Sequence, residues 1–273
     1  MHTMPAMDKV PEEHRILDVS DYARPVARVI VRLLLRTPVS PVHVTLVYSA
    51  VGLAAAILFA LDRWLPLAGA LLLIKSALDA VDGSLARARG HPSRVGRFLD
   101  SICDFLVTVA VFFGIAAGAW RRNGQAHWGL AALAVVCATV QGSVFSYYYV
   151  RYRAQTGGDT TSDINESEAR GYAWDSPRAL GLLHRLYRLI YGWQDWLMDQ
   201  IDLRAAPCAP VSASFLSATT VLGLGTQLLV TAVCAALGQP VWALWIFVVA
   251  FNVYWLALIA VRFFGTPMKR GMS

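Results

Sequence analysis

Long apolar segments dominate this chain and predict helices that cross a membrane. A bilayer core requires about 20 apolar residues per helix, and six stretches meet this length: Val42–Ala60, Trp64–Ala86, Phe98–Trp120, His127–Val150, Val211–Leu237 and Val241–Val261. The turns after the first and fifth stretches are short, so we expect each of them to form an antiparallel hairpin with the stretch that follows. The pattern predicts an all-α integral membrane protein with six transmembrane helices.

Two further stretches have the two-sided pattern of helices that lie at a membrane surface. Between Asp21 and Arg36, arginines recur at positions 24, 28, 32 and 36, and valines, isoleucine and leucines supply an apolar side. This pattern predicts an amphipathic interfacial helix that attracts anionic lipid, with an ordinary helix packed on protein as the alternative. Arg178–Leu203 is similarly amphipathic, and the polar stretch Gln155–Pro177 before it is expected to be a loop.

The distribution of basic residues predicts how the chain is divided and oriented. We expect a cytoplasmic N-terminal segment (1–40), four spans (41–150), a cytoplasmic insert (151–210) and two spans with a C-terminal tail (211–273). With the N-terminus inside, the cytoplasmic parts hold 20 of the 24 Lys and Arg residues and the outer loops hold three. Because cytoplasmic loops carry an excess of Lys and Arg, both termini are expected on the cytoplasmic side of a bacterial inner membrane.

Composition agrees with this class of protein. The 273 residues are 56% apolar and 15% charged, whereas an average soluble domain is about 45–50% apolar and about 25% charged. This balance excludes a disordered, collagen-like or disulfide-stapled chain and argues against an ordinary soluble enzyme. The net charge of +6 in so apolar a chain is more typical of a membrane-facing surface than of nucleic-acid binding.

Four carboxylates lie within the second and third predicted spans: Asp79, Asp82, Asp100 and Asp104. Ionisable groups inside spanning segments are costly and are candidates for function. Each pair is three or four residues apart and shares a helix face, and the short turn between the spans lets the two faces converge at the cytoplasmic end. Carboxylates this close repel one another strongly, which divalent cations that prefer oxygen, such as Mg²⁺ and Mn²⁺, relieve. The alternative is ion pairing with neighbouring cations: Lys75, Arg87, Arg89, Arg94 and Arg97.

The residues between the two pairs suggest what such ions would bind. Gly83 and Ala86 are small enough to let a ligand approach the helix backbone, and Arg87 offers a fork of donors to a phosphate group. Divalent ions, an arginine and small residues together describe a diphosphate site.

The same residues carry a family resemblance. Residues 79–104 read DAVDGSLARARGHPSRVGRFLDSICD and resemble the signature of CDP-alcohol phosphotransferases (CDP-alcohol phosphatidyltransferases), DxxDGxxAR followed by eight residues and GxxxDxxxD. All eight specified positions match. With each residue type at a frequency of roughly one in twenty, a chance match in this chain is on the order of one in 10⁸.

The resemblance implies a role for each matching residue. Asp79, Asp82 and Asp100 resemble metal ligands, with Asp79 and Asp100 bridging two Mg²⁺ or Mn²⁺ ions. Asp104 resembles the catalytic base and also touches the second ion. The positions that shape the CDP pocket in the family correspond here to Gly83, Ala86, Arg87 and Gly96, and Thr45 in the sequence SPVHVT resembles a residue near the nucleotide.

The resemblance also implies an activity in phospholipid biosynthesis. An alcohol would attack the β-phosphorus of a CDP-linked substrate, CMP would leave, and two metal ions would support this single displacement. CDP-diacylglycerol with a polar alcohol is the expected substrate pair, and CDP-choline or CDP-ethanolamine with diacylglycerol is the alternative. The family resemblance further suggests a homodimer.

Some residues outside the motif remain open to two interpretations. Arg151 and Arg153 either bind an acceptor phosphate or are solvated interfacial arginines. A group of aromatic residues either cages a quaternary ammonium or lies at the membrane interface: Tyr147, Tyr148, Tyr149, Tyr172 and Trp174.

Two other functions fit the sequence less well. Membrane prenyltransferases typically carry two Asp-rich motifs that are well separated, whereas both pairs here fall within one hairpin. A cation transporter that uses buried carboxylates predicts inverted repeats or broken helices at mid-membrane, whereas the aspartates here are expected toward one side of the membrane.

Overall fold

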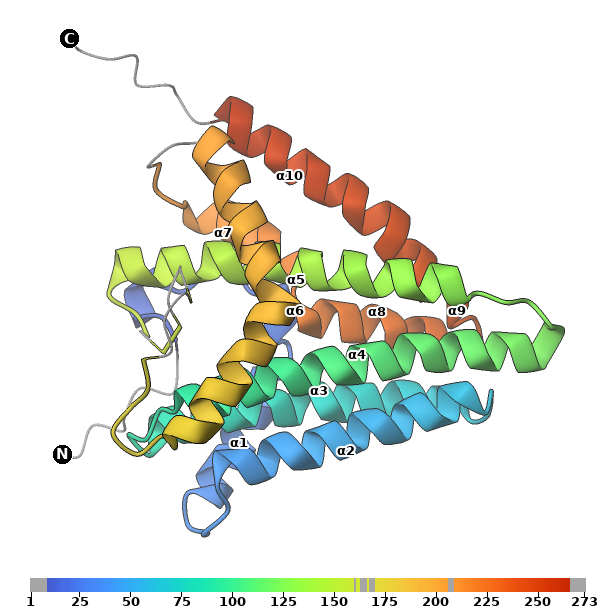
Figure 1. The fold of residues 1–273 in the computed structure, drawn as a ribbon, viewed down its shortest axis with the longest axis horizontal. Helices are drawn as coiled ribbons and strands as arrows, with labels where there is room; N and C mark the ends of the chain where they lie inside the picture. The colour runs from blue at the N-terminus through green and yellow to red at the C-terminus, as the bar shows by residue number, and fades with distance from the viewer. Residues whose placement is uncertain (1–8, 160, 163–165, 167–169, 206–208, 266–273) are drawn as a thin grey trace.

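The computed structural model describes residues 9–159, 161–162, 166, 170–205 and 209–265, and the regular elements in these ranges are helical (Figure 1). The prediction of an all-α protein is therefore confirmed for these ranges. The α-helices are α1 (Arg24–Leu34), α2 (Pro41–Ala60), α3 (Leu65–Ala88), α4 (Arg94–Asn123), α5 (Trp128–Thr156), α6 (Pro177–Ala205), α7 (Ala213–Thr219), α8 (Leu224–Ala236), α9 (Val241–Trp245) and α10 (Phe251–Gly265). Short 3-10 turns form η1 (Glu12–His14), η2 (Val19–Asp21) and η3 (Thr220–Leu222), and a π-helical turn forms η4 (Ile246–Ala250).

Within the described ranges, four helical stretches are long and apolar enough to cross a membrane: Pro41–Ala60, Arg94–Asn123, Trp128–Thr156 and Val241–Phe264. Their most apolar windows are only 22–50% buried inside the protein, so at least half of each window faces outward, as expected of helices surrounded by lipid. The bent pair α7 and α8 makes a fifth if it is one span. Helix α3 is 24 residues long, or about 36 Å, but its charged residues set it apart from these apolar stretches.

Helices α2, α3 and α4 lie side by side and form the part of the bundle that positions the aspartates (Figure 1). Glycines allow α2 and α4 to approach closely. A Cβ atom at Gly114 would lie 2.6 Å from the carbonyl oxygen of Ala56, and one at Gly118 would lie 2.2 Å from that of Phe59. Small residues four apart commonly allow such contacts between membrane helices.

The turn between α3 and α4 brings the two halves of the motif to the same level. Helix α3 ends at Ala88, and Gly90, two residues later, has a φ of 66°. The His91 N–H donates to the Ala86 carbonyl at 3.0 Å, as in a Schellman C-cap. Asp82 lies six residues before the end of α3, and Asp100 lies six residues after the start of α4. At a rise of about 1.5 Å per residue, the two side chains are equally far from the turn.

The predicted fifth span, Val211–Leu237, is broken rather than continuous. Its two halves meet at an angle of 41° at Gly223, where the N-terminal turn η2 packs into the break. A Cβ atom at Gly223 would lie 2.6 Å from the Ser20 Cβ atom, and the Val19 N–H donates to Thr220 Oγ1 at 3.2 Å. The break therefore has a tertiary cause that the local sequence does not contain.

The two predicted amphipathic stretches are helical, and each packs on the bundle. Ala27 and Val31 of α1 are buried against α3, while Val26 and Leu33 on its other side are 55% and 66% exposed. Helix α6 crosses α4 and α5 (Figure 1) and spans the predicted stretch 178–203. Helix α5 continues to Thr156, so the polar connection begins two residues later than expected.

Candidate active site

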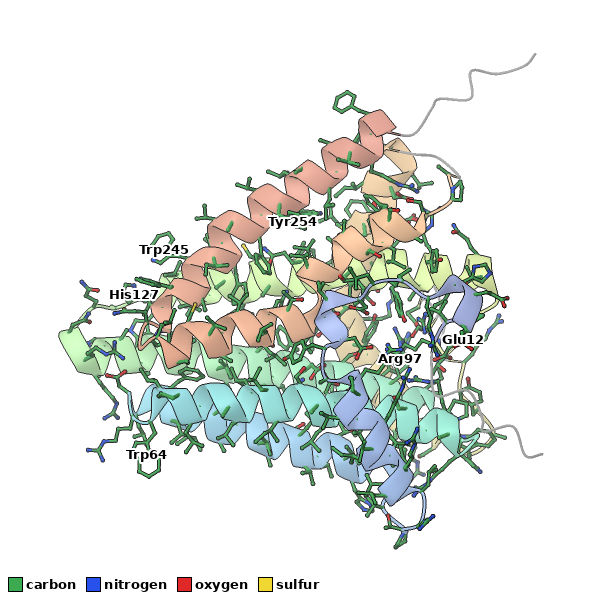
Figure 2. All side chains as sticks on the ribbon, turned by 180° about the vertical axis from the view of Figure 1, so that it is seen from behind. Glu12, Trp64, Arg97, His127, Trp245 and Tyr254 are labelled. Carbon is green, nitrogen blue, oxygen red and sulfur yellow. The ribbon has the colours of Figure 1, made fainter. Side chains whose placement is uncertain are left out.

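The site residues predicted from the sequence all line a single cavity of about 510 Å³. Arg97 also lines this cavity, and it lies at the opposite end of the molecule from Trp64 and His127 (Figure 2). The predicted residues come from α2, α3 and α4: Thr45, Asp79, Asp82, Gly83, Ala86, Arg87, Gly96, Asp100 and Asp104.

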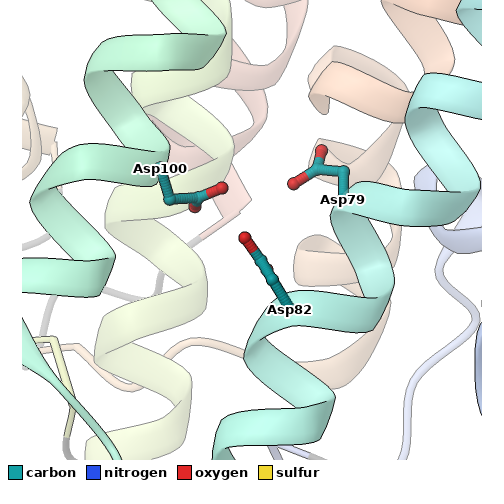
Figure 3. Close-up of side chains that lie close together, drawn as sticks. All are labelled: Asp79, Asp82 and Asp100. Atoms are coloured by element: carbon teal, nitrogen blue, oxygen red, sulfur yellow. The ribbon is translucent and has the colours of Figure 1, made fainter. Parts of the chain in front are cut away.

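Three of the four aspartates form a candidate cation site. Asp79 and Asp82 project from α3 toward Asp100 on α4 (Figure 3), and one carboxylate oxygen of each lies within 4.8 Å of the others. Asp82 is buried and the other two are half-buried. Three carboxylate oxygens at this spacing form a donor set that fits Mg²⁺ or Mn²⁺.

Side chains from α2 hold two of these carboxylates in place. Thr45 Oγ1 donates to Asp82 Oδ2 at 2.7 Å, and the Tyr48 hydroxyl donates to Asp100 Oδ1 at 2.5 Å. Thr45 was expected near a nucleotide, and the structure adds a direct contact with Asp82. Tyr48 is fully buried and was missed by the sequence analysis, although it lies one helical turn after Thr45.

Asp104 lies outside this group of three and contacts Lys75 instead. The Lys75 ammonium forms a short ion pair with Asp104 Oδ1 and lies 3.1 Å from Asp79 Oδ2. Ion pairing, the alternative to a metal site, is therefore realised on this side of the motif. Lys75 precedes Asp79 by four residues, and this spacing places both on one face of α3.

The small motif residues leave room around Arg87. A Cβ atom at Gly83 would lie 3.3 Å from Arg87 Nη1, so a larger residue there would crowd the guanidinium group. Arg87 Nη1 lies 3.5 Å from Asp159 Oδ2, and Arg153 Nη1 lies 3.6 Å from the same oxygen. Two arginines therefore converge on one anionic group at the cavity wall.

This wall is strongly charged. Burial opposes ionisation of Asp159, but hydrogen bonds from Thr161 and the charges of Arg87 and Arg153 outweigh it and lower the pKa of Asp159. Burial and the same two arginines also lower the pKa of Lys9, which lines the cavity. The cavity therefore has an acidic end at the motif and a basic wall that can attract a phosphate group.

Comparison with known proteins identifies the family of this chain. A model of the CDP-alcohol phosphatidyltransferase family matches residues 39–164. A phosphatidylinositol phosphate synthase of Mycobacterium marinum is 30% identical over 225 residues, which cover 81% of this chain and 84% of that protein. The chain belongs to the CDP-alcohol phosphatidyltransferase family. With its apolar helices, this membership makes it an integral membrane protein.

Other relatives match over a shorter length. An archaetidylinositol phosphate synthase of Pyrococcus horikoshii is 35% identical over 130 residues, or 48% of this chain and 63% of that protein. For two further relatives the match covers 54% and 27% of their own length. The crystal structure of Mycobacterium tuberculosis phosphatidylinositol phosphate synthase with CDP-DAG bound is 22% identical, with a TM-score of 0.38, over 70% of this chain and 98% of that chain.

Helix α6, which lies outside the part matched by the family model, adds another wall to the cavity. Tyr187, Tyr191 and Asp195 line the cavity from one face of α6, and the Tyr191 hydroxyl donates to the Ser101 carbonyl at 3.0 Å. Burial raises the pKa of Asp195 to about 6, although the charge of Arg97 lowers it. The sequence analysis placed α6 but had no signal for its contribution to the site.

The residues left open by the sequence are separated in the fold. Arg153 lines the cavity, whereas Arg151 forms an ion pair with Asp202. The hydroxyl groups of Tyr147 and Tyr148 donate to Asp199 and Asp202 on α6.

The remaining aromatic residues of that group divide further. The rings of Tyr172 and Trp174 stack on each other with their centroids 5.3 Å apart, and Tyr149 lines the cavity. The five aromatic side chains therefore belong to different environments rather than to one cage.

Proposed function

We propose that this protein transfers a substituted phosphate group from CDP-diacylglycerol to an alcohol and releases CMP. The observation that carries this proposal is the convergence of Asp79, Asp82 and Asp100 in a cavity that also contains Arg87. The names of the relatives, an archaetidylinositol phosphate synthase and phosphatidylinositol phosphate synthases, favour a phosphorylated alcohol as the acceptor. The basic wall formed by Lys9 and Arg153 supports the same choice, because it can bind the acceptor phosphate.

Asp79, Asp82 and Asp100 would hold divalent metal, Mg²⁺ or Mn²⁺. When bound, such ions neutralise charge on the diphosphate and on the leaving CMP. The family resemblance implies two ions, of which the second would also require Asp104. Arg87, with space kept free by Gly83, would bind a phosphate oxygen, and Ala86 and Gly96 would let the nucleotide approach the helices. Thr45 would act through its hydrogen bond to Asp82.

Asp104 is proposed as the general base. As the alcohol oxygen bonds to the β-phosphorus, its hydroxyl proton passes to the Asp104 carboxylate. The bond between the β-phosphorus and the oxygen of CMP breaks, and its electron pair leaves with CMP. A direct displacement of this kind needs no covalent intermediate with the protein.

In the membrane, we propose α3 as a sixth span beside the four apolar spans and the bent α7–α8 pair. Its charged residues would face the bundle and the cavity, as such residues do in membrane helices. Segments 1–40 and 151–210 would lie at the cytoplasmic interface of a bacterial inner membrane, with spans in 41–150 and 211–273. The exposed apolar side of α1, including Val26 and Leu33, would enter the headgroup layer. A homodimer is proposed from the family resemblance.

The test is CMP release by the purified full-length protein with Mg²⁺ or Mn²⁺. CDP-diacylglycerol would be offered with inositol phosphate, glycerol phosphate, inositol or serine, and CDP-choline would be offered with diacylglycerol. We expect CMP only with CDP-diacylglycerol and a phosphorylated alcohol, and no CMP in excess chelator. CMP from CDP-choline and diacylglycerol would replace the proposal with its alternative, and no CMP in any arm would refute it.

A pair of variants tests the base. Asp104→Asn should reduce CMP release by at least about 10²-fold, the usual scale of general base catalysis, while CDP-diacylglycerol binding is kept. Asp62→Asn is the matched control, because Asp62 pairs with Arg122 outside the cavity, and it should retain activity. Normal turnover by Asp104→Asn would reject the assignment.

A further inference from the structure

Lys75 is a charged side chain in an unusual place. It lies in the middle of α3 and is 1% exposed. Its ammonium group contacts Asp104 and lies 3.1 Å from Asp79 Oδ2. It also lies 4.6 Å from the centroid of the Tyr48 ring. The ammonium is therefore surrounded by two carboxylates and an aromatic face.

A buried ammonium is costly unless its charge is compensated. Lysine carries a compact point charge with three donors, and the loss of water around it must be offset by close anions. Asp79 and Asp104 supply two such anions, and the Tyr48 ring adds a cation–π contact. These contacts identify Lys75 as an integral cation of the acidic cluster rather than a side chain that reaches toward solvent.

The same two carboxylates are those that a second metal ion would need. In two-ion centres the ions lie about 3.5–4 Å apart and share ligands. Here the group with converging oxygens is Asp79, Asp82 and Asp100, which can serve one ion. A second ion would have to lie between Asp79 and Asp104, and this is where the Lys75 ammonium makes its contacts.

We propose that the Lys75 ammonium acts as the second cation of this centre, so that the protein binds one divalent ion in place of two. Lys75 is then a positioning residue: it orients the Asp104 carboxylate and balances its charge, while Asp79, Asp82 and Asp100 bind the ion. This inference rests on the proposed function, because it concerns the metal centre of that reaction.

The number of bound ions can be measured directly with Mn²⁺ on the full-length protein in a neutral detergent. Electron paramagnetic resonance counts free Mn²⁺, and it separates an isolated ion, with six resolved lines, from two ions about 4 Å apart, which are spin-coupled and broadened. We expect one Mn²⁺ per chain and a spectrum without coupling for the unmodified protein. Lys75→Met, which removes the charge at similar length, should bind two coupled ions.

Two further variants control for charge and for folding. Lys75→Arg keeps a cation at this position and should still bind one ion. Lys9→Met removes another lysine charge from the same cavity, where the Lys9 ammonium lies 5.9 Å from the centroid of the Tyr149 ring. This variant should also bind one ion. A merely structural role of Lys75 would not make the methionine variant gain an ion.

The outcomes are distinct. Two coupled ions in the unmodified protein would overturn the inference even if Lys75→Met failed to fold. One ion in both the unmodified protein and a folded Lys75→Met variant would also overturn it. CMP release with two bound ions would leave the proposed function intact, whereas no Mn²⁺ binding together with no CMP release would refute both.

Discussion

Replacing Tyr48 by phenylalanine should weaken binding of the divalent ion without disturbing the fold. The Tyr48 hydroxyl donates to Asp100 Oδ1 at 2.5 Å, and the side chain is fully buried in α2. Phenylalanine keeps the ring and its contact with Lys75 but removes this donor. Asp100 then loses the hydrogen bond that orients it toward Asp79 and Asp82.

The size of the effect follows from the charge of the acceptor. A hydrogen bond to a charged group contributes about 1.5–3 kcal/mol, which corresponds to about 10–150-fold in an equilibrium constant at about 1.4 kcal/mol per factor of ten. Mutation of a group that orients a metal ligand usually lowers the metal affinity by about 10–100-fold. We therefore expect Tyr48→Phe to bind Mn²⁺ about 10–100-fold more weakly.

The assay is a Mn²⁺ titration of the purified protein, followed by the signal of free Mn²⁺ and by the Mn²⁺ concentration that half-saturates CMP release. Tyr254→Phe is the matched control, because its hydroxyl donates to the Ala218 carbonyl at 2.9 Å and does not line the cavity. A change of less than about threefold for Tyr48→Phe, or an equal loss for Tyr254→Phe, would refute the reasoning.

Two other predictions concern stability. Gly118→Ala should destabilise the protein by about 1–3 kcal/mol, because the new Cβ would lie 2.2 Å from the Phe59 carbonyl oxygen. Gly129→Ala on α5, which has open space around it, is the control and should not lower the melting temperature. Equal melting temperatures for the two variants would contradict this packing argument. The raised pKa of Asp195, about 6 against 3.8 in the unfolded chain, predicts that stability falls as pH rises from about 4 to 6, because only the folded chain then keeps the proton. Asp195→Asn removes this titration, so it should be more stable than the unmodified protein by about 1–2 kcal/mol above pH 6 and lose this advantage near pH 4. Thermal melting at the two pH values checks this, and a gap independent of pH would contradict the rise in the pKa of Asp195 that burial causes.

The motif could be located from the sequence because its geometry is local. Asp79 and Asp82 share a face of α3 by helical spacing, and the short turn at Gly90 places Asp100 at the same level on α4. Each step follows from helix geometry over fewer than 30 residues. The convergence of the three carboxylates was therefore predictable before any tertiary contact was known.

The partners of the motif could not be found in the same way. Helix α2 is apolar on all sides, so its pattern does not indicate which side faces α3 and α4. Tyr48 therefore resembled any other aromatic residue in a span, although it contacts Asp100. The break at Gly223 was hidden for a similar reason, because its cause is Ser20, about 200 residues earlier in the chain.

The site residues that could be predicted from the sequence and those that could not lie in different parts of the cavity. The acidic end comes from one hairpin, and its residues match the family signature. The basic wall and the α6 wall are assembled from distant segments, with Lys9 near the N-terminus, Arg153 at the end of α5 and Asp195 on α6. These walls line the same cavity as the aspartates, and in the proposed reaction the acceptor would approach Asp104 there. The choice of acceptor is thus expected to depend on residues outside the motif, and variants of Arg153 or Asp195 should change acceptor preference more than ion binding.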